Sequence, residues 1–184
     1  LPKTMDYVQD VLGTLDCEVL FPLDSAVCAY FDFGAADTLA FRAEMDALPI
    51  AERTGLPFAS QHSGKMHACG HDMHTTMMLG AARLLKAHED EIEGTVKLMF
   101  QPAEETTGGA KTVCESGVFE RYGADRIFGF HVWPDLLAGT LASCSGPLLA
   151  RSSETHIHIH GTSIHIAKTY GVPVEESHDA ALAA

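Results

Sequence analysis

The sequence predicts an α/β protein, built as a layered sheet with helices on both of its faces. Apolar residues recur at helical spacing near the start of the chain and again over residues 72–87. Short runs rich in β-forming residues separate and follow these helices. Helical and strand-like segments thus alternate along the chain, which is the pattern of a sheet covered by helices.

Each element is predicted from its own residue pattern. Met5, Val8, Leu12 and Leu15 share one face of a helix, and residues 126–132 are rich in β-formers. The expected elements are, in order, a helix around residues 5–15, strands at 17–23, 27–34 and 38–45, a helix at 72–87, a strand at 94–101, a helix at 108–116 and a strand at 126–132.

The character of the chain changes around Gly146 and Pro147, which predicts two domains. Residues 1–150 are expected to form a metal-binding catalytic domain, and residues 151–184 the beginning of a lid or dimerisation domain, both of them incomplete. The second part predicts a strand at 156–160 and a helix around 175–184, too little to bury a core alone. We therefore expect a piece of a longer protein, or one completed by another subunit.

Charge and composition exclude several classes of partner. The formal net charge is −13 with only 12 lysine and arginine residues, so nucleic acid is not expected as a partner. No apolar run reaches membrane-spanning length and the amino terminus lacks a signal-peptide pattern, so we expect no membrane contact and a cytoplasmic protein. Five cysteines without CxxC spacing suit a reducing compartment better than a disulfide framework.

Polar clusters follow three of the expected strands, where the chemistry of α/β sheets collects. They are Glu44 with Asp46, the adjacent pair Glu104 and Glu105, and His131. The densest cluster of all, residues 66–74, holds one thiol, three imidazoles and a carboxylate just before a helix. Taken alone, such a cluster also fits a helix cap with solvated histidines, and a lone Glu-Glu pair is usually a solvated surface feature.

Together these residue types match the needs of a hydrolytic metal site. Such a site requires several N, O and S ligands, an open position for water, and a carboxylate off the metal that takes the proton of that water. Of two adjacent glutamates, one can bind the metal while the other takes the proton of the water.

Four strings in this order resemble the di-metal aminoacylase and carboxypeptidase amidohydrolases, a group that includes hippurate hydrolases and plant auxin-conjugate hydrolases. The strings are FRAEMDALPI at 41–50, MHACGHDMHT at 66–75, FQPAEE at 100–105 with GGA at 108–110, and GFHVWP at 129–134. The resemblance covers nearly the whole chain. It implies hydrolysis of the amide bond of small N-acyl amino acids by a metal-activated water.

The resemblance also implies roles for individual residues and for cofactors. It assigns Cys69, His71, Glu105 and His131 as metal ligands, Glu104 as the general base, His165 as an oxyanion-stabilising lid residue, and Asp46 as a carboxylate that orients a metal ligand. Two divalent ions are implied, with Zn²⁺, Mn²⁺, Co²⁺ and Ni²⁺ all compatible with the ligand set. The family fold carries a lid inserted into the catalytic domain, which implies a homodimer formed through the lid.

Some positions depart from the family pattern. Glu44 stands where relatives usually have Asp, and the lid string around His165 is degenerate. The amino-terminal His-Pro-Glu region and the late histidine ligand of relatives have no counterpart in these 184 residues. We therefore expect a central piece of the enzyme that has little activity alone.

Several alternatives remain beside this interpretation. His156, His158 and His160 could form a metal-binding ladder, but the solvent face of an antiparallel sheet explains them more simply. His74, one helical turn past His71, could orient a ligand. A thiol protease would need a base and an orienting group that the sequence does not offer. The rival of a different class is a metal-binding or dimerising remnant without catalysis.

Overall fold

The computed structural model describes residues 2–34, 37–106, 108–149, 155–161 and 165. The chain divides into two compact units, Leu1–Leu136 and Leu137–Ala184. All helices and strands of the described residues belong to the first unit. The fold of this unit therefore determines how the predicted metal ligands are placed.

A mixed five-stranded sheet forms the centre of the first unit, in the order β1-β2-β4-β3-β5. The antiparallel part is β1-β2-β4, and β3 runs parallel to both β4 and β5. The strands are β1 (Glu18–Leu23), β2 (Ala26–Asp32), β3 (Thr38–Glu44), β4 (Thr95–Gln101) and β5 (Arg126–Gly129).

The three parallel strands end at the same edge of the sheet. Glu44 of β3 is paired with Gln101 of β4, and Arg42 of β3 is paired with Gly129 of β5. The segments that leave these strands therefore start side by side, although the strands are far apart in sequence. This is the edge at which α/β sheets collect their functional loops.

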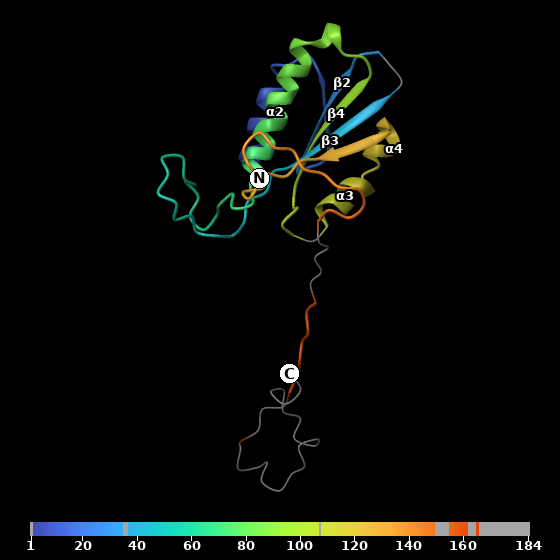
Figure 1. Cartoon of the computed structure of the whole chain (residues 1–184). Coiled ribbons are helices and arrows are strands. Elements are labelled where there is room, and N and C mark those ends of the chain that lie inside the picture. The colour runs from blue at the N-terminus through green and yellow to red at the C-terminus, as the bar shows by residue number, and fades with distance from the viewer. Residues whose placement is uncertain (1, 35–36, 107, 150–154, 162–164, 166–184) are drawn as a thin grey trace. The chain divides into compact units, whose positions relative to one another are not determined.

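Helices cover both faces of the sheet, as Figure 1 shows. Helices α1 (Pro2–Leu12) and α2 (His71–Ala87) pack on one face, and α3 (Gly109–Glu115) and α4 (Val118–Tyr122) pack on the other. Strand β4 serves both cores, because Leu98 and Phe100 join the first cluster whereas Met99 joins the second. This alternation is the period of two that a strand imposes on its side chains.

The expectation of an α/β sheet with helices on both faces is confirmed. The predicted strand at 156–160 is wrong, because the described residues 155–161 contain no strand and are exposed. The predicted helix at 175–184 lies outside the described residues, and the domain boundary at 150/151 stays a prediction. Among the described residues, no helix combines the length and apolar character needed to cross a membrane.

Candidate metal centre

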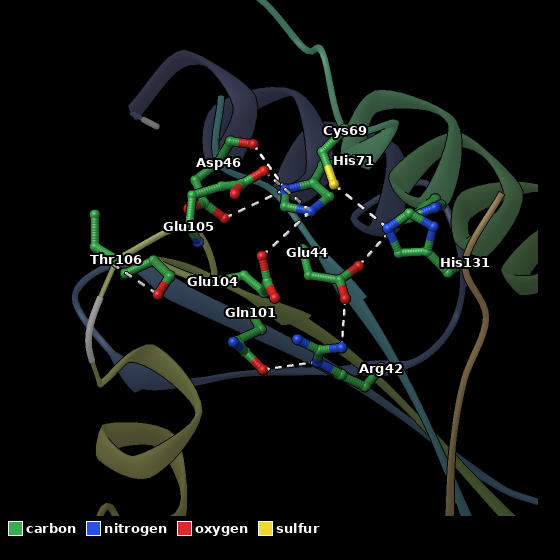
Figure 2. A network of polar contacts seen from close by, with 12 residues as sticks. Arg42, Glu44, Asp46, Cys69, His71, Gln101, Glu104, Glu105, Thr106 and His131 are labelled. Carbon is green, nitrogen blue, oxygen red and sulfur yellow. Dashed lines mark hydrogen bonds and ion pairs between the residues drawn. The ribbon is translucent and has the colours of Figure 1, made fainter. Parts of the chain in front are cut away.

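Six of the seven predicted site residues belong to the first unit and gather at the carboxyl edge of its parallel strands (Figure 2). Asp46 follows β3, Glu104 and Glu105 follow β4, and His131 follows β5. Cys69 and His71 come from the start of α2, directly around Gly70. Gly70 has a φ of 110°, a left-handed conformation that glycine adopts without steric cost and that turns the chain into the helix.

His71 is the most buried of these side chains, with 1% of its surface exposed. Its Nδ1 lies 2.9 Å from the backbone oxygen of Asp46. A carbonyl oxygen only accepts, so Nδ1 carries a proton and donates it, which leaves Nε2 as the atom that can offer a lone pair to a metal ion. That Nε2 lies 3.7 Å from Oε2 of Glu104 and 3.9 Å from Oε1 of Glu105, distances too long for direct hydrogen bonds.

Asp46 connects two of the predicted ligands. Its backbone oxygen accepts the His71 proton, and its carboxylate Oδ2 accepts a hydrogen bond of 3.0 Å from the backbone N–H of Glu105. These contacts fix the ring of His71 and the backbone of Glu105 relative to each other. They are the kind of support that orients metal ligands.

Cys69 and His131 lie next to each other on the other side of His71. The Cys69 Sγ is 3.3 Å from Nε2 of His131, whose Nδ1 donates to the backbone oxygen of Val132 at 2.7 Å. Because Nδ1 of His131 donates to Val132, its Nε2 is the nitrogen that offers a lone pair, and this atom faces Cys69. Burial, followed by the negative charge of Glu105, raises the pKa of the Cys69 thiol to about 11.

The donor set fits a metal ion. Nε2 of His71 and Oε1 of Glu105 are both buried and make no hydrogen bond with any described residue. Cys69, His71 and Glu105 each offer a ligand atom within 4.8 Å of the others. Buried polar atoms normally have partners, so these two are best explained by a shared cation. Thiolate, imidazole and carboxylate are the ligands that Zn²⁺ and similar ions accept.

A second group of possible ligands, Glu44, His71 and His74, is less suited to metal. Both ring nitrogens of His74 are already used, since Nδ1 lies 2.9 Å from Oε2 of Glu44 and Nε2 accepts the backbone N–H of Val132 at 3.0 Å. The other oxygen of Glu44 pairs with Arg42. Burial lowers the pKa of His74, partly offset by its bond to Glu44, which favours the neutral ring.

The sequence placed Glu44 in a polar cluster with Asp46 and marked it as a departure from the family pattern, but it gave no role to Glu44, Arg42 or Gln101. Nε of Arg42 donates to Oε1 of Gln101 at 2.8 Å, and the two residues come from neighbouring strands. Only strand register brings them together, so the sequence carried no signal for this contact. His165, the seventh predicted residue, belongs to the second unit and is exposed, and its role stays a prediction.

Comparison with known proteins relates this cluster to described enzymes. Over 129 residues the chain is 49% identical to the N-acetyl-L-cysteine deacetylase of Bacillus subtilis (strain 168), a match covering 70% of this chain and 30% of that protein. It is 50% identical over 166 residues to the IAA-amino acid hydrolase ILR1-like 4 of Arabidopsis thaliana, covering 90% of this chain and 37% of the relative. The chain thus spans about a third of the length of these curated relatives.

A solved structure and a family model agree with these matches. The YXEP protein of Bacillus subtilis, described as a dinuclear metal-binding peptidase from the M20 family, superposes with a TM-score of 0.69 at 44% identity. That superposition covers 73% of this chain and 38% of the other. The model of peptidase family M20/M25/M40 matches residues 40–184, which include every predicted site residue. The chain therefore belongs to the peptidase family M20/M25/M40.

Proposed function

We propose that the intact protein hydrolyses the amide bond of small N-acyl amino acids with the help of two divalent metal ions. The observation that carries this proposal is the buried pair of Nε2 of His71 and Oε1 of Glu105, which make no hydrogen bond with the described residues and lie beside the Cys69 thiol. The names of the relatives support the substrate class, since they describe deacetylation of N-acetyl-L-cysteine and hydrolysis of amino acid conjugates.

The proposed mechanism gives the two glutamates different tasks. When bound, divalent ions supply Lewis acidity, which makes a water acidic and polarises the substrate carbonyl. Cys69, His71, Glu105 and His131 would hold the ions. Glu104 is the most exposed carboxylate of the cluster, at 38% of its side chain, and its carboxylate takes the proton of the attacking water and then delivers it to the leaving amine.

Metal identity, assembly and location complete the proposal. The thiol of Cys69 favours Zn²⁺, while the imidazole and carboxylate ligands also accept Mn²⁺, Co²⁺ or Ni²⁺. All five cysteines are free thiols, which supports a reducing compartment such as the cytoplasm. A domain that begins near residue 151 is proposed to supply His165 as an oxyanion-stabilising group and to form a homodimer contact.

Metal removal tests the proposed activity directly. The intact protein is dialysed against a chelator, its metal content is checked, and hydrolysis of N-acetyl, N-benzoyl and indole-acyl amino acids is measured before and after adding Zn²⁺, Mn²⁺ or Co²⁺. We expect activity to disappear and to return with at least one of these ions. Full activity in verified metal-free protein would overturn the metal mechanism. Metal binding without hydrolysis of any acyl amino acid would favour the non-catalytic remnant.

A further inference from the structure

A buried pair of side chains, Glu44 and His74, lies beside the proposed metal ligands without belonging to them. Glu44 is 3% exposed and His74 is 2% exposed. The pair joins the end of β3 to α2, and Thr75 strengthens this joint by donating from its hydroxyl to the backbone oxygen of Glu44 at 2.9 Å. A buried carboxylate needs such partners, because burying it unpaired is costly.

The hydrogen bonds of His74 fix its tautomer. The backbone N–H of Val132 can only donate, so Nε2 of His74 must be the acceptor at 3.0 Å. Nδ1 then carries the proton and donates it to Oε2 of Glu44 at 2.9 Å. The carboxylate thus sets the ring so that its lone pair faces Val132. Arg42 holds the other oxygen of Glu44 and is itself bonded to Gln101, which completes the network in Figure 2.

Val132 is the residue that links this network to His131. Its backbone N–H is held by His74, and its backbone oxygen accepts the Nδ1 proton of His131. The valine side chain packs against Gly70, where an added Cβ would come within 2.4 Å of Cγ2 of Val132. The preceding strand β5 is exposed. Residues 131–132 are instead held next to Cys69 by the contacts of Val132 with Gly70 and His74, at the start of α2.

We propose that His74, oriented by Glu44, is a positioning residue that holds the backbone at Val132 and thereby keeps Nε2 of His131 beside Cys69. This inference deepens the proposed metal centre and rests on it for its effect on metal affinity. His74 acts through the 131–132 backbone and does not itself bind the ion. Partners that orient a metal-binding histidine typically change metal affinity 10- to 100-fold when they are removed.

Two substitutions of His74 separate the proposed hydrogen bond from simple packing. In His74→Gln the side-chain oxygen can reach the position of Nε2 and accept from Val132. In His74→Asn the shorter side chain reproduces only the Nδ1 donor to Glu44. His88→Asn is the matched control, since His88 caps the far end of α2 and has 54% of its side chain exposed. Thermal melts of all variants check that they fold.

Binding of Co²⁺ alone to the intact metal-free protein provides the first readout. We expect His74→Asn to weaken Co²⁺ binding about 10- to 100-fold. The thiolate-to-cobalt absorption from Cys69 should be retained and the ligand-field bands should change. His74→Gln should keep most of the affinity and the wild-type spectrum, and His88→Asn should keep both. Equal loss in the Asn and Gln variants, or loss in neither, would overturn the positioning role.

The second readout does not depend on metal, and its first measurement needs only the wild-type protein. Nitrogen-15 NMR of the histidine rings in the metal-free wild-type protein should give His74 with its proton on Nδ1. A proton on Nε2 would contradict the inference. If the wild-type protein binds no Co²⁺ while His74 shows the expected tautomer and His74→Asn alters the ring signals of His131, the positioning role stands and the metal centre fails.

Discussion

At the scale of single residues, Glu104 and Glu105 illustrate how neighbours of the same type receive different environments. The side chain of Glu105 is 19% exposed, and its backbone N–H donates to the carboxylate of Asp46. The side chain of Glu104 is 38% exposed. Ala103, the residue before this pair, has a φ of 54°, a left-handed conformation that is costly for a residue with a Cβ. Such backbone strain is often retained at functional sites.

This difference predicts an asymmetric result for substitutions in the intact enzyme. Glu104→Gln keeps the shape and removes the proton acceptor, so kcat should fall by roughly 10² to 10⁴. Its metal content should hardly change. Glu105→Ala removes a metal ligand, so bound metal should fall together with activity, and excess metal should restore part of both. Metal analysis beside steady-state kinetics checks this. Near-normal activity in both variants would exclude both residues from the proposed mechanism.

Trp133 gives an optical reporter of the same site. It is the only tryptophan of the chain, and its ring centroid lies 6.1 Å from that of His131. A paramagnetic ion held by His131 should therefore quench its emission. We expect Co²⁺ to quench the fluorescence of the metal-free protein with saturation, and His131→Ala to abolish the saturable part. Saturable quenching that survives His131→Ala would place the ion elsewhere.

The sequence could name the candidate ligands because thiol, imidazole and carboxylate types recur in recognisable strings. It could not reveal how His74 is used, because its partner is a backbone N–H and every non-proline residue has one. The suggestion that His74 orients a ligand stays a prediction. The structure adds that its contact is to Val132, the residue after the predicted ligand His131.

At the scale of elements, residue patterns predicted the long helices and the strands within a few residues. Helices α1 and α2 each bury one regular set of apolar side chains, whereas β4 is buried on both faces and β5 is exposed. Helix α4 (Val118–Tyr122) was missed, since five residues between Gly117 and Gly123 are too short to show a period. The pattern at 156–160 failed for a different reason. Alternation describes a strand only where a neighbouring strand pairs with it, and the described residues 155–161 pair with none.

Two glycine-to-alanine changes in helices should have opposite effects. Gly109 is the first residue of α3 and packs against the backbone of Pro102, which leads into the loop with Glu104 and Glu105. A Cβ on Gly109 would lie 2.2 Å from the backbone oxygen of Pro102. Gly109→Ala should therefore destabilise the fold by about 1–3 kcal/mol and weaken metal binding by displacing that loop. Gly80 lies in the exposed middle of α2 with no atom within 4 Å of such a Cβ. Gly80→Ala should stabilise the fold by about 0.5–1 kcal/mol and leave metal binding unchanged.

Denaturant unfolding together with Zn²⁺ titration measures both effects. Gly80→Ala controls for the general effect of adding a methyl group to a helical glycine. Equal stability changes in the two variants would show that the close approach of α3 to the Pro102 backbone does not constrain the loop.

At the scale of the whole molecule, the candidate centre joins segments that are distant in sequence. Asp46 follows β3, Cys69 precedes α2, His71 is its first residue, Glu105 follows β4 and His131 follows β5. The cluster is rich in carboxylates and the chain carries a net charge of −13, so the metal-free state concentrates like charges at one edge of the sheet. A bound cation would relieve this repulsion and link the loops to the helix.

Metal should therefore stabilise the folded protein. An ion that binds only the folded state, at a concentration 100 times its Kd, adds about 2.7 kcal/mol to the free energy of unfolding. For a chain of this size that corresponds to a rise in Tm of roughly 5–10 °C. We expect this rise on adding Zn²⁺ to the metal-free protein, and a much smaller one with Mg²⁺, which prefers oxygen ligands in octahedral geometry.

Cys69→Ala removes the thiol and leaves the carboxylates. It therefore distinguishes two causes of the stabilisation by Zn²⁺: binding at a site that includes the thiol, and general screening of the carboxylate charges. The Zn²⁺-induced rise in Tm should shrink in this variant, whereas the Mg²⁺ response should stay as in the wild-type protein. Calorimetric scans at several Zn²⁺ concentrations measure both. If Zn²⁺ raised the Tm of wild-type and Cys69→Ala protein equally, the stabilisation would come from charge neutralisation alone, and the thiol would have to be dropped from the ligand set.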